Sequence, residues 1–180
     1  MIQEIMAYNH AFVANKEYET YRTSKYPDKK IAIVSCMDTR LTELLPAALG
    51  LKNGDAKIIK NAGGIISHPF GSVMRSLLIA IYELNVQEIL IIGHTDCGAR
   101  HTDGQKMVEK MKAQGIAQKD IDLIKYFGVE FDSWLSGFKD LEMTVKKSVE
   151  LVQTHPLVPE GIMVYGLIID SETGELRKVL

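Results

Sequence analysis

The chain has 180 residues, of which 46% are hydrophobic and 24% are charged. These proportions are typical of a globular protein, and a chain of this length forms one domain that buries about 70% of its unfolded surface. A disordered chain is therefore excluded. The 21 basic and 23 acidic side chains nearly cancel, to a net charge of −2, which argues against a nucleic-acid-binding protein with a basic face.

The sequence also lacks the features of an exported or membrane protein. No apolar run approaches the roughly 18 residues of a membrane span, and the first residues do not form a signal peptide. We therefore expect a soluble, cytoplasmic protein that does not bind membranes. Structural disulfides are rare in that compartment, so the two cysteines, Cys36 and Cys97, need another explanation.

Apolar patterns predict strands that alternate with helices. Strands are predicted where Ile and Val form unbroken apolar runs, and helices where apolar residues recur every three or four positions. In chain order the predicted elements are a helix over 2–16, a strand over 31–35, a short helix over 41–49, a strand over 56–60, a helix over 69–85, a strand over 88–93, one or two helices within 103–126, a helix over 131–152, a strand over 162–169 and a short antiparallel edge strand after Gly174.

This alternation predicts an α/β fold with a mainly parallel central sheet, flanked by helices and wound with right-handed crossovers. We expect a single domain over residues 1–180, in which residues 1–25 form an N-terminal helical arm. Pro69 is expected in the first turn of its helix, and the apolar stripe over 131–152 is expected to be one continuous helix. Functional sites in such sheets form beyond the carboxyl ends of the strands.

Five chemically active residues follow two of these predicted strands. Cys36, Asp38 and Arg40 come after the first strand in SCMDTR, and His94 and Cys97 come after the third in GHTDCGA. Two thiolates and one imidazole are typical zinc ligands, and catalytic zinc sites use three protein ligands and leave a fourth position open. We therefore predict one zinc ion per chain. Asp38 and Arg40 would point to the same side of an extended chain, next to the metal.

Three motifs in this order, SCMDTR, NAGG at 61–64 and GHTDCG, resemble those of the β-class carbonic anhydrases, and the short chain resembles the compact branch of that family. The resemblance implies a zinc lyase that interconverts carbon dioxide and bicarbonate. It matches Cys36, His94 and Cys97 with the zinc ligands, and Asp38 and Arg40 with the catalytic dyad. It also implies a homodimer or a dimer of dimers, in which the N-terminal arm lies across the partner subunit.

The expected mechanism combines this resemblance with the chemistry of zinc. Zinc lowers the pKa of a bound water from about 15.7 toward about 7, which supplies hydroxide at neutral pH. Two thiolate ligands weaken this effect, so an additional group must favour the hydroxide. We expect Asp38, held ionised by Arg40, to accept the proton and to orient the nucleophile. The paired glycines of the NAGG loop would let the backbone approach the site closely.

Three other functions remain open on the sequence. A carbon disulfide or carbonyl sulfide hydrolase would share the scaffold and the ligand set. A noncatalytic zinc protein would use Asp38 as the fourth ligand of a closed site, and a redox protein would use the two cysteines, which lack the Cys-x-x-Cys spacing typical of that class. The role of Asp96 is also open, between a cap of the following helix and a hydrogen-bond partner of the site.

Overall fold

The computed structural model describes all 180 residues and has a single-domain α/β architecture. Five strands form one sheet in the order β2-β1-β3-β4-β5. Their bounds are β1 Ile31–Cys36, β2 Ala56–Asn61, β3 Glu88–His94, β4 Met163–Ile169 and β5 Leu176–Lys178. The first four strands are parallel, and β5 runs antiparallel to β4. The predicted parallel sheet and its antiparallel edge strand are both confirmed.

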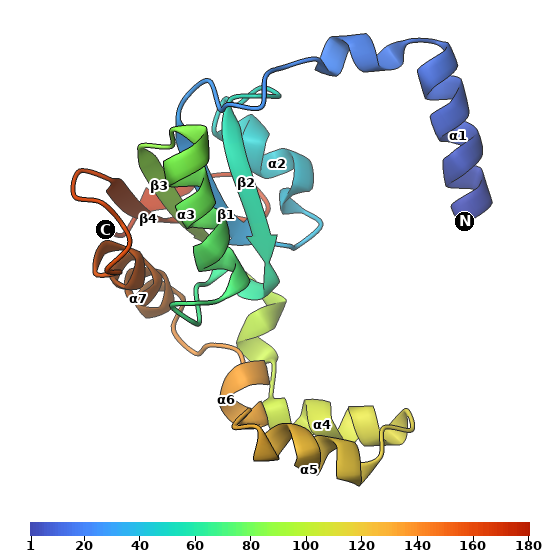
Figure 1. Cartoon of the computed structure of the whole chain (residues 1–180), viewed down its shortest axis with the longest axis vertical. Helices are drawn as coiled ribbons and strands as arrows, with labels where there is room; N and C mark the ends of the chain where they lie inside the picture. The colour runs from blue at the N-terminus through green and yellow to red at the C-terminus, as the bar shows by residue number, and fades with distance from the viewer.

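Helices pack on both faces of the sheet (Figure 1). Their bounds are α1 Ile2–Ala14, α2 Leu41–Ala48, α3 Ser72–Leu84, α4 Gly104–Ala113, α5 Gln118–Tyr126, α6 Phe131–Leu135 and α7 Leu141–Gln153, with short 3₁₀ helices η1 Glu17–Tyr21, η2 Ala62–Gly64 and η3 Gly98–His101. None of these helices has both the length and the apolarity that crossing a membrane requires.

The sheet separates two buried clusters of apolar side chains. Because side chains alternate along a strand, Ala32 and Val34 of β1 face α3 and α7, in a cluster of 15 buried residues. Ile33 lies in a second cluster, of 8 buried residues, together with side chains of α2. This second cluster also contains Cys36 and Cys97. The cysteines predicted to bind zinc therefore lie in the interior, at one end of the sheet.

The strand order explains why the predicted site residues meet. Strands β2 and β3 flank β1 on opposite sides, so the connections after β1 and β3 lead away in opposite directions. Such a reversal is a topological switch point, where the carboxyl ends of parallel strands leave room for a site. Cys36 is the last residue of β1, and His94 is the last residue of β3.

The predicted continuous helix over 131–152 is wrong. The structure divides it into α6 and α7, with residues 136–140 between them. Phe138 in this break is buried in the cluster at the sheet end, and the Asp140 carboxylate accepts a backbone N–H as the N-cap of α7. Trp134, which the stripe would bury, is 64% exposed. The apolar spacing thus continues across two helices that pack against different surfaces.

The helix that was expected to start at Pro69 begins three residues later, at Ser72. The Pro69 carbonyl instead accepts a hydrogen bond from Nε2 of His155, at 2.9 Å. His155 is buried between α7 and β4. This bond ties the loop before α3 to the connection before β4, which explains why the backbone at Pro69 does not join the helix.

Two parts of the chain project from this body (Figure 1). The first is residues 1–25, which we call the arm. Its helix α1 has no buried residue and stands apart from the sheet. The second consists of α4, α5 and α6, which we call the helical projection. It has a small core of its own, formed by Val108, Ile121 and Phe131.

Candidate metal centre

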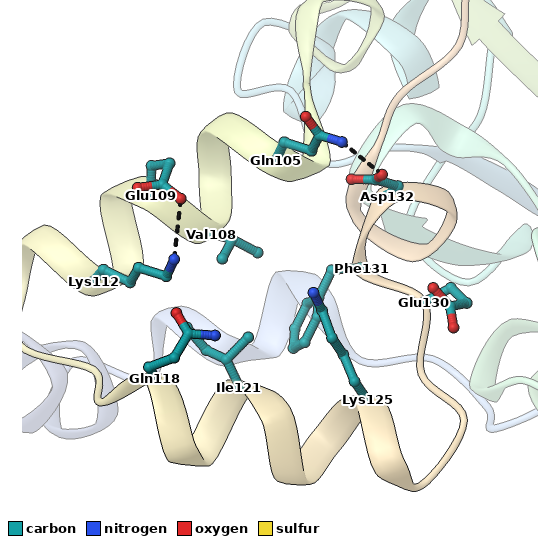
Figure 2. A pocket seen from close by; sticks show the side chains of 10 residues that line it. All are labelled: Gln105, Val108, Glu109, Lys112, Gln118, Ile121, Lys125, Glu130, Phe131 and Asp132. Atoms are coloured by element: carbon teal, nitrogen blue, oxygen red, sulfur yellow. Dashed lines mark hydrogen bonds and ion pairs between the residues drawn. The ribbon is translucent and has the colours of Figure 1, made fainter.

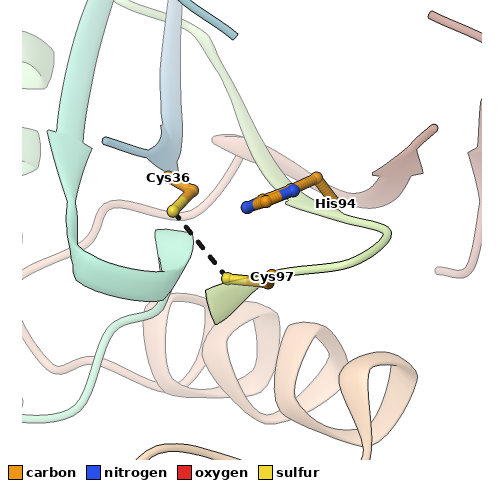
Figure 3. Close-up of side chains that lie close together, drawn as sticks. All are labelled: Cys36, His94 and Cys97. Atoms are coloured by element: carbon orange, nitrogen blue, oxygen red, sulfur yellow. Dashed lines mark hydrogen bonds between the residues drawn. The ribbon is translucent and has the colours of Figure 1, made fainter. Parts of the chain in front are cut away.

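The ends of β1 and β3 bring Cys36, His94 and Cys97 together (Figure 3). The two sulfur atoms are 3.9 Å apart, and the possible ligand atoms of the three residues all lie within 4.8 Å of one another. The exposed fractions are 0% for His94, 1% for Cys97 and 5% for Cys36. The fold thus gathers, in a buried position, the three residues that were predicted as zinc ligands.

This donor set fits a tetrahedral zinc ion. Zinc–sulfur bonds of about 2.3 Å place two thiolates about 3.8 Å apart in a tetrahedron, and the sulfur atoms here are 3.9 Å apart. Nε2 of His94 is buried and has no hydrogen-bond partner. Buried nitrogen atoms in folded proteins nearly always have a partner. A metal ion between the three side chains would satisfy this one.

Burial sets the protonation of the cluster. It lowers the pKa of His94, which keeps the imidazole neutral at pH 7, as metal binding requires. It also raises the pKa of the Cys97 thiol to about 11. Without a metal, Cys97 is therefore protonated at neutral pH, and binding of a divalent cation would release this proton.

Asp38 and Arg40 lie on the loop between β1 and α2, beside the cluster. Arg40 donates through Nε to Oδ1 of Asp38 at 3.0 Å, and through Nη2 to Oδ2 at 2.9 Å. These side-chain hydrogen bonds are the main reason that the pKa of Asp38 is lowered to about 2. The carboxylate is thus ionised throughout the neutral range. Its Oδ2 lies 3.9 Å from Nε2 of His94.

Arg40 also joins the two loops that form the site. Its Nη1 donates to Oδ2 of Asp96, and its Nη2 donates to the Asp96 carbonyl, both at 3.0 Å. Asp96 adopts a left-handed backbone conformation, with φ of 51°, and makes no side-chain cap to the following helix η3. Of the two roles left open for Asp96, the structure therefore selects the partner of the site.

The NAGG loop places backbone directly against the end of β1. Gly64 has a positive φ of 65°, and a Cβ atom at this position would lie 2.8 Å from the backbone nitrogen of Cys36. Both observations require glycine, because other residues rarely adopt this φ and would collide with the strand. The close approach that the sequence predicted for this loop is confirmed at Gly64.

Lys60, the residue before this loop, was not among the residues predicted for the site. Its Nζ donates to the backbone carbonyls of Cys36 at 3.4 Å and Leu41 at 3.2 Å. These two carbonyls bracket the loop that carries Asp38, so Lys60 holds that loop at both ends. Burial lowers the pKa of Lys60. A lysine at the end of an apolar strand ordinarily points into solvent, and no sequence pattern indicates this role.

A cavity of about 800 Å³ lies beside the candidate site. Asn61, which pairs with Cys36 in the strand register, lines one side of it. Ile65, Val129 and Trp134 contribute apolar walls. The cavity thus extends from the sheet end to the helical projection, where the exposed Trp134 lines it.

The helical projection contains a second, smaller hollow, of about 240 Å³ (Figure 2). Four of its polar side chains form two pairs: Lys112 donates to Glu109 at 3.2 Å, and Gln105 donates to Asp132 at 2.9 Å. No histidine or cysteine lines it. The cluster that can bind a metal therefore belongs to the sheet end and not to this hollow.

Comparisons with known proteins agree with the fold and the donor set. The carbonic anhydrase family model matches residues 31–176. YtiB of Bacillus subtilis, provisionally named as a carbonic anhydrase, is 53% identical over 180 residues, which are 100% of this chain and 96% of YtiB. A carbon disulfide hydrolase of Acidithiobacillus thiooxidans is 31% identical over 175 residues, covering 92% of this chain and 85% of the hydrolase.

Solved structures give the same result. The β-carbonic anhydrase isoform I of Trichomonas vaginalis matches with a TM-score of 0.88 and 37% identity, over 100% of this chain and 97% of the other. The carbonic anhydrase of Streptococcus mutans matches with a TM-score of 0.73 and 33% identity, over 96% and 97% of the two chains. A parallel α/β sheet with a buried Cys-His-Cys cluster at its switch point indicates a metalloenzyme. The chain belongs to the β-class carbonic anhydrases, a family of lyases.

Proposed function

We propose that this protein is a zinc-dependent carbonic anhydrase that interconverts carbon dioxide and bicarbonate. Cys36, His94 and Cys97 would hold the zinc ion. The observation that carries the proposal is the buried, partnerless Nε2 of His94 beside two sulfur atoms 3.9 Å apart. When bound there, zinc would lower the pKa of a coordinated water molecule toward neutrality, which makes a nucleophile available.

Asp38 would orient that nucleophile by accepting a hydrogen bond from it. Three hydrogen bonds from Arg40 fix the carboxylate, and its Oδ2 is the oxygen nearest the cluster, 3.9 Å from Nε2 of His94. A carboxylate with a pKa of about 2 is a weak base, so it accepts a hydrogen bond without storing the proton. This refines the sequence-based mechanism, in which Asp38 takes the proton itself.

Arg40 would keep Asp38 away from a metal ion held by the cluster. It binds both oxygens of Asp38 on one side and Asp96 on the other, so the aspartate is held back from the ligand cluster. A closed site, as in a noncatalytic zinc protein, would require Asp38 to leave these bonds. The observed contacts therefore favour a catalytic site over a closed structural one.

Carbon dioxide has no net charge and no dipole, so the protein must bind it through apolar surface close to the nucleophile. Ile65, which lines the cavity beside Asn61, also packs against the buried cluster that contains Cys36 and Cys97, and it offers such a surface. The polar lining of the cavity, which includes Asn61 and Ser67, suits the release of the charged product. These features support carbon dioxide and bicarbonate as the small-molecule substrates.

Stopped-flow measurement of carbon dioxide hydration by the zinc-loaded protein tests this proposal. We expect hydration activity and about one zinc ion per chain. His94→Gln should lose the metal, and His101→Gln is the matched control because His101 is an exposed residue of η3 outside the cluster. Full zinc retention by His94→Gln would contradict the ligand set. Hydrolysis of carbon disulfide without carbon dioxide hydration would replace the proposal with the hydrolase activity.

We further propose that the arm packs across a second copy of the chain, in a homodimer or a dimer of dimers. Helix α1 has no buried residue, yet Ile2, Ile5 and Val13 are exposed on it. A helix of this length is marginal in water unless it packs against other structure. Light scattering should show a dimer or larger assembly for the full chain and a smaller mass after deletion of residues 1–16. A fully active monomer would contradict this assembly.

A further inference from the structure

His94 presents its two ring nitrogens to different surroundings. Nε2 faces the sulfur atoms of Cys36 and Cys97 (Figure 3), and Nδ1 lies 2.7 Å from the backbone carbonyl oxygen of Thr95. A carbonyl oxygen only accepts hydrogen bonds, so Nδ1 carries the ring proton and Nε2 keeps its lone pair for a metal ion. The Thr95 carbonyl therefore sets the tautomer of His94.

The Thr95 carbonyl is itself held by Ser171. The Ser171 hydroxyl donates to this carbonyl oxygen at 3.1 Å, and the Ser171 N–H donates to the Thr95 hydroxyl oxygen at 3.0 Å. A carbonyl oxygen has two lone pairs, so Ser171 occupies one and leaves the other for His94. Ser171 is only 4% exposed, which protects this reciprocal pair from competition by water.

The turn after β4 fixes Ser171 in its place. Oδ1 of Asp170 accepts the N–H of Glu172 at 3.0 Å and the N–H of Thr173 at 2.8 Å. Oδ2 of Asp170 accepts the Thr95 hydroxyl at 3.3 Å. The Asp170 carboxylate thus holds the turn through its backbone N–H groups and links it to Thr95. A segment 76 positions away along the chain is therefore hydrogen-bonded to the carbonyl next to His94.

We propose that Ser171 is a positioning residue for His94, an inference that rests on the zinc site of the proposed function. Ser171 acts through the Thr95 carbonyl, which orients the imidazole. Removal of a direct hydrogen-bond partner of a ligating histidine weakens metal binding by about 10- to 100-fold. Ser171 is separated from His94 by one additional hydrogen bond. Loss of its hydroxyl should therefore raise the zinc dissociation constant about tenfold, at the lower end of that range.

Competition with a chromophoric chelator measures this constant in the wild-type and Ser171→Ala chains. Ser148→Ala is the matched control, because Ser148 is also buried, at 2% exposure, and its hydroxyl oxygen accepts the N–H of Ile66 away from the cluster. Ser148→Ala should bind zinc like the wild type. Cobalt(II) in place of zinc gives a second measurement: its visible absorption bands report ligand geometry and should shift in Ser171→Ala but not in Ser148→Ala.

The outcomes separate this inference from the proposed function. A wild-type chain that binds no zinc would overturn the zinc site itself. If the wild type binds zinc and Ser171→Ala binds it equally tightly, only the positioning role is overturned. Equal weakening in both serine variants would also overturn it, because a general loss of packing would then explain the result.

A second variant keeps the test decisive if Ser171→Ala does not fold. Thr95→Val removes the hydroxyl oxygen that accepts the Ser171 N–H and keeps a side chain of similar shape. Since one half of the reciprocal pair is lost, zinc binding should weaken severalfold, somewhat less than the roughly tenfold loss expected for Ser171→Ala. Wild-type zinc affinity in folded Thr95→Val would contradict the positioning role.

Discussion

The sheet end and the helical projection both combine apolar and charged residues, but their positions are fixed in different ways. At the sheet end, Cys36 and His94 finish strands that are paired with neighbours on both sides. Clusters of 15 and 8 buried residues hold these strands. The helical projection has a core of 3 buried residues. The difference teaches that the candidate metal site is built where the backbone has the least freedom, while the projection is held by far fewer buried contacts.

The strongest test of this comparison replaces one carboxylate in each region by the corresponding amide. Asp38→Asn should retain zinc but lose about 10²-fold in hydration rate, because the nucleophile is then no longer held in the productive orientation. Asp132→Asn in the helical projection should keep the wild-type rate, because Asp132 only accepts a hydrogen bond from Gln105. Stopped-flow hydration, with the zinc content checked in each variant, measures both. Wild-type activity in Asp38→Asn would show that the sheet end positions a metal without using this carboxylate.

A second test removes a buried isoleucine from each region. Ile91 is 0% exposed in β3, and Ile121 is 2% exposed in α5. Ile91→Ala should lower the free energy of unfolding by about 4 kcal/mol, because the side chains of the large cluster cannot move to fill the space that the truncation leaves. Ile121→Ala should mainly open the projection, so hydrogen exchange should rise in α4 and α5 while the global free energy changes by about 1 kcal/mol. Equal global losses would show that the two regions unfold as one unit.

The third and smallest effect compares two glycines with positive φ. Gly64 lies against the backbone of β1, whereas Gly128, after α5, has no atom within 4 Å of the position that a Cβ would take. Gly64→Ala should lower the free energy of unfolding by about 3 kcal/mol, through backbone strain and the collision with Cys36. Gly128→Ala introduces backbone strain without a collision, so it should lower the free energy of unfolding by only about 1 kcal/mol. Urea denaturation measures both, and similar losses would indicate that the close approach at Gly64 relaxes without cost.

Sequence patterns were sufficient to predict the sheet end because the arrangement of its strands follows from simple rules. Unbroken runs of Ile and Val predict buried parallel strands, and parallel strands end at one edge, so Cys36, His94 and Cys97 were expected to meet. The break at residues 136–140 was missed because Phe138 keeps the helical spacing while it packs against the sheet end. Apolar spacing reports that a residue is buried, and it does not report which surface buries it.

The hydrogen bonds around the site could not be predicted for a different reason. Ser171 and Lys60 act through backbone carbonyls of residues that are distant in sequence. Such contacts leave no periodic pattern, and a serine after a strand or a lysine at a strand end is ordinary on a protein surface. Only the three-dimensional arrangement shows that these side chains hold the loops of the site.

The separation of Cys36 and Cys97 along the chain has a consequence for the order of events in folding. These residues are 61 positions apart, and they meet only after β1 and β3 have paired, which requires closure of a long crossover. Parallel pairing of this kind is slow, because the entropy of loop closure is lost before the contacts form. The complete donor set therefore arises late, on a sheet that already exists. Zinc bound there, as the proposed function requires, would stabilise the finished protein and slow its unfolding, and it would leave the rate of folding largely unchanged.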